Sequence, residues 1–323
     1  MSQPTLATTH APRIVSLLPS VTEIVVALGL GEHLVARSHQ CDFPPQVTHL
    51  PALSRSRIAP GGSAREIHQR VGEVLQQGLA MYEVDAARLQ ALAPHYILSQ
   101  TQCAICAVTP GDLQSALAAW PAATPRPQVV SVEPADLAEV FEVIRHLGRV
   151  LQVPERGERV AATLAARISA LARRTAGLAR PSVVALEWTD PLIAAGNWVP
   201  ELIECAGGRC VLGTRGEESP ALPFAELEAA DPDVIVITPC GFTLADGIAE
   251  LELLARQPQW AGLRAVRDRR VYVVDGVHYF NRPGPRLVES AEILAEILHP
   301  QACDFGHRDK VWIPATPWLP RAA

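Results

Sequence analysis

The 323-residue chain has little charge, few aromatic side chains and almost no lysine. Charged residues make up 19% and aromatic residues 5% of it, and Lys310 is the only lysine. Acidic residues (34) outnumber basic ones (28), so the net charge is −6. Nucleic-acid-binding surfaces carry a basic face, so this balance argues against that class. The hydrophobic share of 48% is enough for a core and argues against disorder.

Long apolar runs are also missing. No stretch reaches about 18 uncharged apolar residues, so the sequence predicts no membrane span. Residues 1–13 lack the basic start and apolar run of a secretory signal, and the first apolar run, Ile14–Leu18, is short. We therefore expect a cytoplasmic protein. In that reducing compartment the seven cysteines would bind metal or stay free rather than form disulfides.

Common enzyme signatures are absent from the sequence. There is no GxSxG elbow, no GxxxxGK[ST] phosphate loop and no HExxH zinc motif. The glycine pairs at 61–62 and 207–208 follow no predicted strand directly, so neither fits a dinucleotide-binding fingerprint. These absences favour a non-catalytic role.

Short β-branched runs alternate with longer helical patterns, which is typical of βαβ units with parallel sheets. The predicted strands are residues 13–18, 34–37, 96–99, 129–131, 182–186, 234–238 and 271–274. The predicted helices are residues 20–28, 134–150, 198–206 and 285–298. Ser20 followed by Glu23 matches a capping box at the start of the first helix.

The alternation stops over residues 155–178, which read as one alanine- and arginine-rich helix, and then restarts. The sequence thus predicts an α/β protein of two Rossmann-like lobes with parallel sheets, joined by a single long helix. The expected divisions are a first lobe at 13–152 with an insertion at about 54–81, a connecting helix within 153–180, a second lobe at 181–298 and an irregular tail at 299–323. We expect the insertion to be turn-rich and then helical, with no strand.

Four cysteines follow predicted strands: Cys41, Cys103, Cys106 and Cys240. Ligands of open parallel sheets bind outside the carboxyl ends of the strands, so the fold would bring these thiols to one site. Cys103 and Cys106 form a CxxC, and four thiolates suit zinc or an iron–sulfur cluster. Two alternatives stay open: a redox dithiol, and small buried residues that pack as hydrophobes.

Other polar residues also follow the predicted strands. His39 and His278 lie on strand-end loops, where they would bind metal or ligand, or simply hydrogen-bond within the loop. Glu187, beside Trp188, would clasp a ligand or hydrogen-bond between the lobes.

Four segments carry a resemblance to a known family: residues 14–23, 38–45, 91–94 and 280–286. They resemble the cobalamin and iron-chelate solute-binding proteins, the class III binding proteins of ABC importers, in order over about residues 13–298. The resemblance implies two α/β lobes with one connecting helix and a ligand held between the lobes by strand-end loops. Together with the strand-end rule, it gives these candidate ligand-binding residues: Ser38, His39, Gln40, Phe43, Gln100, Gln102, Glu187, Trp188, Trp198, His278, Tyr279 and Phe280.

The sequence departs from that family in its docking charges. Family members present a glutamate on each lobe that docks on permease arginines, whereas the matching positions here are Ala87 and Asn281. We therefore expect no docking to an ABC permease, and a signal-less cytoplasmic branch with cysteine-rich loops.

The function expected from these features is a non-catalytic binding protein. It would hold a metal-containing ligand in the cleft between the lobes. That ligand would be a corrinoid such as cobalamin, or an iron–sulfur cluster or metal ion tied by Cys41, Cys103, Cys106 and Cys240. The alternatives are a redox or metal-dependent enzyme that uses the Cys103–Cys106 dithiol, and a ligand-sensing regulator that acts on a protein partner.

Overall fold

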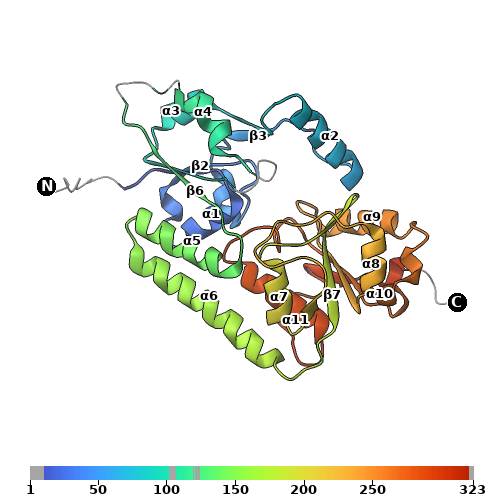
Figure 1. Cartoon of the computed structure of the whole chain (residues 1–323). Helices are drawn as coiled ribbons and strands as arrows, with labels where there is room; N and C mark the ends of the chain where they lie inside the picture. Colours follow the sequence, from blue (N-terminus) through green and yellow to red (C-terminus); the bar gives the residue numbers. More distant parts are fainter. Residues whose placement is uncertain (1–10, 102–106, 119, 121–123, 320–323) are drawn as a thin grey trace. The chain divides into compact units, whose positions relative to one another are not determined.

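The computed structural model describes residues 11–101, 107–118, 120 and 124–319. Its contacts divide the chain into two compact units, each built around its own sheet (Figure 1). The first unit comprises Met1–Ala59, Val74–Glu133 and His146–Gly157; the second comprises Pro60–Glu73, Pro134–Arg145 and Glu158–Ala323. The lobe boundaries expected from the sequence stay a prediction.

The sheet of the first unit has four parallel strands in the order β2-β1-β5-β6. Their bounds are β1 (Ile14–Ser16), β2 (Leu34–Arg37), β5 (Tyr96–Gln100) and β6 (Gln128–Val132). All three residues of β1 are fully buried. A central parallel strand is covered on both faces and therefore reads as a continuous apolar run. The parallel α/β pattern expected from the sequence is confirmed.

Three helices lie wholly in this unit: α1 (Pro19–Ala27), α3 (Ala86–Leu92) and α4 (Pro110–Ala118). The predicted capping box is wrong, because α1 begins at Pro19 with Leu18 as its N-cap and no side-chain cap. Proline suits the first helical position, where no N–H is required, so the helix starts earlier than Ser20. The Ser20 hydroxyl is instead buried and has no hydrogen-bond partner among the described residues.

The insertion contains a strand, which corrects the expectation that it has none. β3 (Ser54–Ser56) pairs antiparallel with β4 (Tyr82–Val84), and α2 (Ala64–Gln76) lies between them in sequence. The polar run Ser54-Arg-Ser carries no apolar alternation, so its strand forms through pairing with β4 rather than through a buried face of its own.

The sheet of the second unit follows the order β12-β11-β10-β7-β8, with β9 paired to β7. Its central strands are parallel, whereas the edge strands β8 and β12 are antiparallel. The bounds are β7 (Ser182–Thr189), β8 (Leu192–Ala194), β9 (Arg209–Cys210), β10 (Val234–Ile237), β11 (Val271–Val274) and β12 (Trp312–Pro314). Antiparallel edges on a parallel sheet are common in α/β proteins.

The helices of this unit pack around that sheet. They are α7 (Val199–Cys205), α8 (Phe224–Ala230), α9 (Leu244–Leu254), α10 (Arg264–Arg267) and α11 (Leu287–Leu298). The tail is not wholly irregular, because β12 joins β11 there. The indole N–H of Trp312 donates to Glu296 Oε2 at 2.7 Å, and its ring meets Tyr272 edge-on. These distant contacts, which no local pattern announces, fix the strand.

Two long helices, α5 (Leu137–Val150) and α6 (Pro154–Thr175), run side by side in opposite directions (Figure 1). A Cβ on Gly148 would lie 2.8 Å from the Cα of Gly157, so these glycines allow close approach. The long helix expected at 155–178 is thus present as α6. Among the described residues, no helix is long and apolar enough to cross a membrane.

Candidate ligand-binding site

In the first unit, the loop after β2 is tied down by the β3–β4 ribbon. His39 Nδ1 lies 2.9 Å from Ser54 Oγ, and the imidazole packs 5.7 Å from the Tyr82 ring. Burial, with a smaller contribution from the Arg37 charge, lowers the pKa of His39. The neutral imidazole of His39 is therefore favoured, and one of its ring nitrogens is already engaged by Ser54.

The thiol of the same loop is buried. Cys41 is fully buried, and its Sγ lies 3.8 Å from the Ser16 carbonyl oxygen in β1. Ser38 Oγ accepts the N–H of Gln40 at 3.1 Å. Ser38 and Cys41 thus hold the turn together. Gln40 Oε1 is buried, and no hydrogen-bond partner for it lies in the described part of the chain.

Further candidates of the first unit follow β2 and β5. Gln100 is 4% exposed and its amide donates to the Ala107 carbonyl oxygen at 3.3 Å. Phe43 is 37% exposed, so its aromatic ring presents apolar surface to solvent. Gln102, Cys103 and Cys106 lie outside the described residues, so their predicted roles stay predictions.

In the second unit, Glu187 is placed by β7 at the carboxyl end of the sheet. Ser219 Oγ donates to Glu187 Oε2 at 2.6 Å and accepts the Gly196 N–H at 3.0 Å. Burial raises the pKa of Glu187, and the hydrogen bond from Ser219 offsets only part of that rise. This carboxyl group is biased toward its protonated, uncharged form.

Cys240 follows β10 and lies close to Glu187. Its backbone N–H donates to the Glu187 carbonyl oxygen at 3.1 Å. Burial, reinforced by the Glu187 charge, raises the pKa of Cys240 to about 12. The group is a neutral thiol at ordinary pH, and a metal would have to displace its proton to bind it.

The aromatic candidates of this unit differ in how much surface they present. Trp188 is half-buried, with its indole N–H donating to the Asp190 carbonyl oxygen at 3.2 Å and its ring edge-on to Phe242. Trp198 and Phe280 are 6% and 1% exposed, and the Trp198 indole N–H donates to the Phe280 carbonyl oxygen at 2.6 Å. Trp198 and Phe280 therefore pack in the interior of the unit, whereas Trp188 keeps exposed surface.

The loop after β11 carries His278 and Tyr279. His278 Nδ1 lies 3.0 Å from Asp275 Oδ2. Burial raises the pKa of Asp275, but its hydrogen bond and charge interaction with His278 outweigh burial, so the pKa lies below its usual value. Arg286 stacks over the Tyr279 ring at 5.5 Å. Asp275 thus orients the His278 imidazole.

Three residues that the sequence did not single out organise these loops. Ser54 and Tyr82 hold His39, and Ser219 holds Glu187. The serines lie far from their partners in the chain and match no motif, so only the tertiary structure reveals them.

The predicted four-cysteine site stays a prediction. Two of its thiols are outside the described residues, while Cys41 and Cys240 belong to different units. Where the chain is described, no three His, Cys, Asp or Glu side chains gather closely enough to hold a metal ion.

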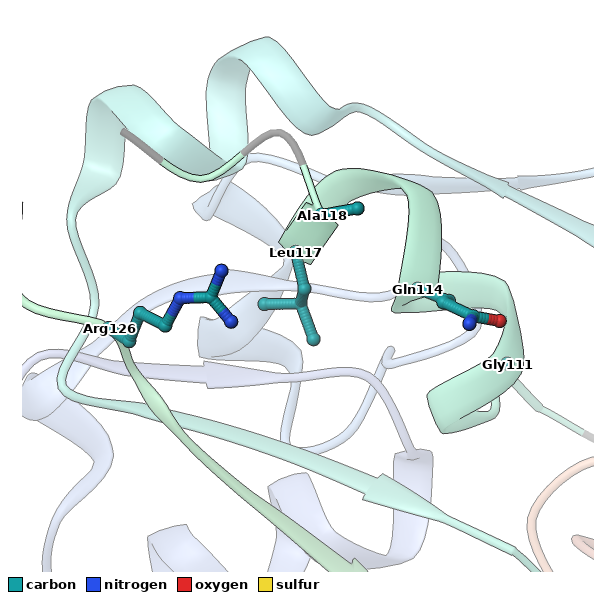
Figure 2. A pocket seen from close by; sticks show the side chains of 5 residues that line it. All are labelled: Gly111, Gln114, Leu117, Ala118 and Arg126. Carbon is teal, nitrogen blue, oxygen red and sulfur yellow. The ribbon is translucent and has the colours of Figure 1, made fainter. Parts of the chain in front are cut away.

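A separate hollow of about 480 Å³ lies beside α4 in the first unit (Figure 2). It is open to solvent, and the Arg126 side chain extends toward Leu117 there. Gly111, Gln114 and Ala118 complete the lining shown. Of the predicted ligand-binding residues that the structure describes, none lines it.

Comparison with known proteins supplies the family. The periplasmic binding protein family matches residues 14–277. The chain belongs to that family. The Vitamin B12-binding protein of Vibrio cholerae is 25% identical over 302 residues, covering 89% of each chain. An uncharacterized ABC transporter substrate-binding lipoprotein of Bacillus subtilis is 21% identical, over 89% of this chain and 80% of that protein.

Solved structures agree on the fold. A periplasmic heme-binding protein of Roseiflexus sp. RS-1 covers 91% of this chain with 26% identity and a TM-score of 0.64, and the match spans 100% of that chain. The Vitamin B12-binding protein of V. cholerae covers 89% of this chain and 96% of its own, with 21% identity and a TM-score of 0.62. The predicted fold class and family resemblance are confirmed. Because the family consists of binding proteins, the expected non-catalytic role is confirmed as well.

Proposed function

We propose that this chain binds a metal-containing macrocycle of the cobalamin or heme type without transforming it. The observation that carries the proposal is the breadth of the matches. Proteins named for vitamin B12 binding and for heme binding each match about nine tenths of the chain. Such ligands bring their own metal, so the protein supplies surface and at most an axial donor.

Three titratable side chains that follow strands support the same proposal, because burial disfavours their charged forms. His39, Glu187 and Cys240 are each biased toward the uncharged form by burial. Neutral, partly apolar edges favour a ligand with a large uncharged surface over a small anion. Each unit also has an aromatic ring with solvent-exposed surface of the kind that stacks on a macrocycle: Phe43 in the first unit and the half-buried Trp188 in the second.

Among the axial donors, His278 is favoured over Cys240. Its Nδ1 is engaged by Asp275, which is the arrangement that orients a histidine whose other ring nitrogen binds a metal. Cys240 would first have to lose a proton whose pKa is about 12. The alternative of zinc or an iron–sulfur cluster on four cysteines would instead require thiolates.

A spectroscopic titration with cyanocobalamin and with hemin tests the proposal. We expect saturable binding of at least one of them. Trp188→Ala should weaken binding about tenfold, as expected for an aromatic contact residue. Trp318→Ala, which removes another half-buried tryptophan of the second unit, is the matched control and should leave binding unchanged. Binding of neither probe would contradict the proposal.

Cellular location and partner belong to the proposal as well. The names of the B. subtilis relative and of a Listeria monocytogenes substrate-binding structure support a transporter partner. Two positions support the opposite expectation, that the chain does not dock on a permease, because neither carries a docking glutamate. Ala87 is exposed on α3, and the Asn281 amide donates to the Gly276 carbonyl oxygen at 2.9 Å. We keep the prediction of a cytoplasmic protein that does not dock on a permease. Fractionation of cells and co-purification with a permease would check both points.

A further inference from the structure

Residues 60–73 belong to the second unit although the chain on both sides belongs to the first. The chain leaves the first unit after Ala59 and re-enters it at Val74. β3 and β4, which flank this excursion, pair with each other inside the first unit. We call residues 60–73, which include most of α2, the strap.

One buried carboxylate fixes the strap to the second unit. Glu250 of α9 is 3% exposed, and its Oε1 accepts the backbone N–H of Ala64, the first residue of α2, at 2.9 Å. Its Oε2 accepts the Thr189 hydroxyl in a short hydrogen bond. A buried carboxylate is costly unless hydrogen bonds satisfy it, and the positive end of a helix suits a negative group. Glu250 therefore favours the docked strap.

The remaining contacts of the strap are weak. In α2, only Ala64 and Val71 are buried. Arg65 pairs with Asp190 at 2.6 Å, but their side chains are 74% and 41% exposed, so the pair contributes little. Segments with few buried apolar contacts open locally at low free-energy cost.

The strap also carries its own helix cap. Glu66 Oε2 accepts the backbone N–H of Ser63 at 2.8 Å, and Ser63 Oγ accepts the N–H of Glu66 at 3.3 Å. This reciprocal capping lies within the strap and does not involve Glu250. The start of α2 can remain helical when the strap leaves Glu250, so the segment would move as one piece.

The docking point adjoins the candidate site. Thr189 and Asp190 follow directly after Glu187 and Trp188 at the carboxyl end of β7. The Trp188 indole N–H donates to the Asp190 carbonyl oxygen at 3.2 Å. Movement of the strap would thus change the surroundings of the same strand end that presents Trp188.

We propose that the strap docks and undocks as one segment on the second unit, with Glu250 as its anchor, and that ligand binding is coupled to docking. The coupling rests on the proposed function, whereas the strap itself does not. A ligand shifts such an equilibrium by its differential affinity for the docked and undocked forms.

Hydrogen exchange of the ligand-free full chain tests the anchor. In Glu250→Ala, amides of residues 64–73 should exchange at least about tenfold faster, because both hydrogen bonds of the carboxylate are lost. Glu252→Ala removes an exposed glutamate from the same helix and should leave exchange unchanged. Unchanged exchange of 64–73 in Glu250→Ala, or equally faster exchange throughout β10 and β11, would overturn the anchor.

The same measurement with cyanocobalamin or hemin tests the coupling. Whichever probe binds the wild type should change the exchange of residues 64–73, and its Kd for Glu250→Ala should differ at least about threefold from that for Glu252→Ala. Binding that leaves both unchanged would overturn the coupling. If neither probe binds, the proposed function fails and the coupling with it, while the ligand-free experiment still decides the anchor.

Discussion

The two sheets present different titratable groups at the carboxyl ends of their strands. In the first unit, burial lowers the pKa of His39 and so favours the neutral base. In the second unit, burial raises the pKa of Glu187 and so favours the neutral acid. Desolvation acts on both, yet the resulting dependence of stability on pH has opposite signs. In each unit, burial thus shifts the pKa of one group in the direction that disfavours its charged form.

The two carboxyl ends of the sheets also differ in the contacts that stabilise them. The largest expected effect on stability comes from that difference. In the second unit, the loops at this end are stabilised by Trp198, which is 6% exposed and whose indole N–H donates to the Phe280 carbonyl oxygen. Trp198→Ala should lower the free energy of unfolding by about 3–5 kcal/mol, as expected for a large buried side chain. Trp198→Phe keeps most of the packing and should cost about 1–2 kcal/mol for the lost hydrogen bond. If the two variants lose the same free energy of unfolding in chemical denaturation, packing of the indole contributes little.

The acid of the second edge should make the protein less stable as pH rises. The pKa of Glu187 in the folded protein exceeds 4.5, so the folded state binds this proton more tightly than the unfolded chain does. Wild-type stability therefore falls between pH 4.5 and the raised pKa. Glu187→Gln can still accept the Ser219 hydroxyl but cannot ionise.

We expect Glu187→Gln to gain stability relative to the wild type as pH rises from about 4 to about 7, measured by urea unfolding. Ser219→Ala is the complementary variant, because it removes the one hydrogen bond that favours the charged acid. A difference between Glu187→Gln and wild type that does not vary with pH would show that Glu187 ionises normally.

The base of the first edge should act in the opposite direction. The pKa of His39 in the folded protein lies below 6.5, so the folded state binds fewer protons than the unfolded chain between that pKa and 6.5. Wild-type stability should fall as pH drops through this window. His39→Asn places a non-titrating polar group near Ser54 and should remove that fall.

The smallest expected effect on stability concerns Cys41, the thiol that follows β2 in the first unit. Cys41 is fully buried with its Sγ directed at the Ser16 carbonyl oxygen. Cys41→Ser keeps a donor there and should change stability by about 1 kcal/mol or less. It should also leave the metal content and cobalamin affinity of the protein unchanged. A loss of bound zinc or iron in Cys41→Ser would instead support the predicted four-cysteine site.

The sequence predicted the parallel strands well because buried strands read as continuous apolar runs. Val234–Ile237 and Val271–Val274 are examples. It missed β3 and β12, whose pairing depends on distant partners: β4 for the first, and β11 with Glu296 for the second. Neither β3 nor β12 carries a local pattern that announces its pairing.

The candidate site was predicted in outline only. The strand-end rule placed Glu187 and Cys240 after neighbouring strands, and the Cys240 backbone N–H donates to the Glu187 carbonyl oxygen there. Neither the burial that raises the pKa of both groups nor the hydroxyl of Ser219 follows from residue type or spacing. The role of Glu250 was equally hidden, because a buried glutamate on an amphipathic helix looks like a surface residue until its partners are known.

The metal content of the protein after loading tests the central claim most directly. The purified chain is incubated anaerobically with excess cyanocobalamin or hemin, passed through a desalting column and analysed for cobalt, iron, zinc and sulfide alongside its absorption spectrum. The account predicts about one cobalt or one iron per chain with the bands of the intact macrocycle, and no acid-labile sulfide. Zinc, or iron with sulfide, in a chain that retains neither macrocycle would contradict it and favour a cysteine-bound metal site.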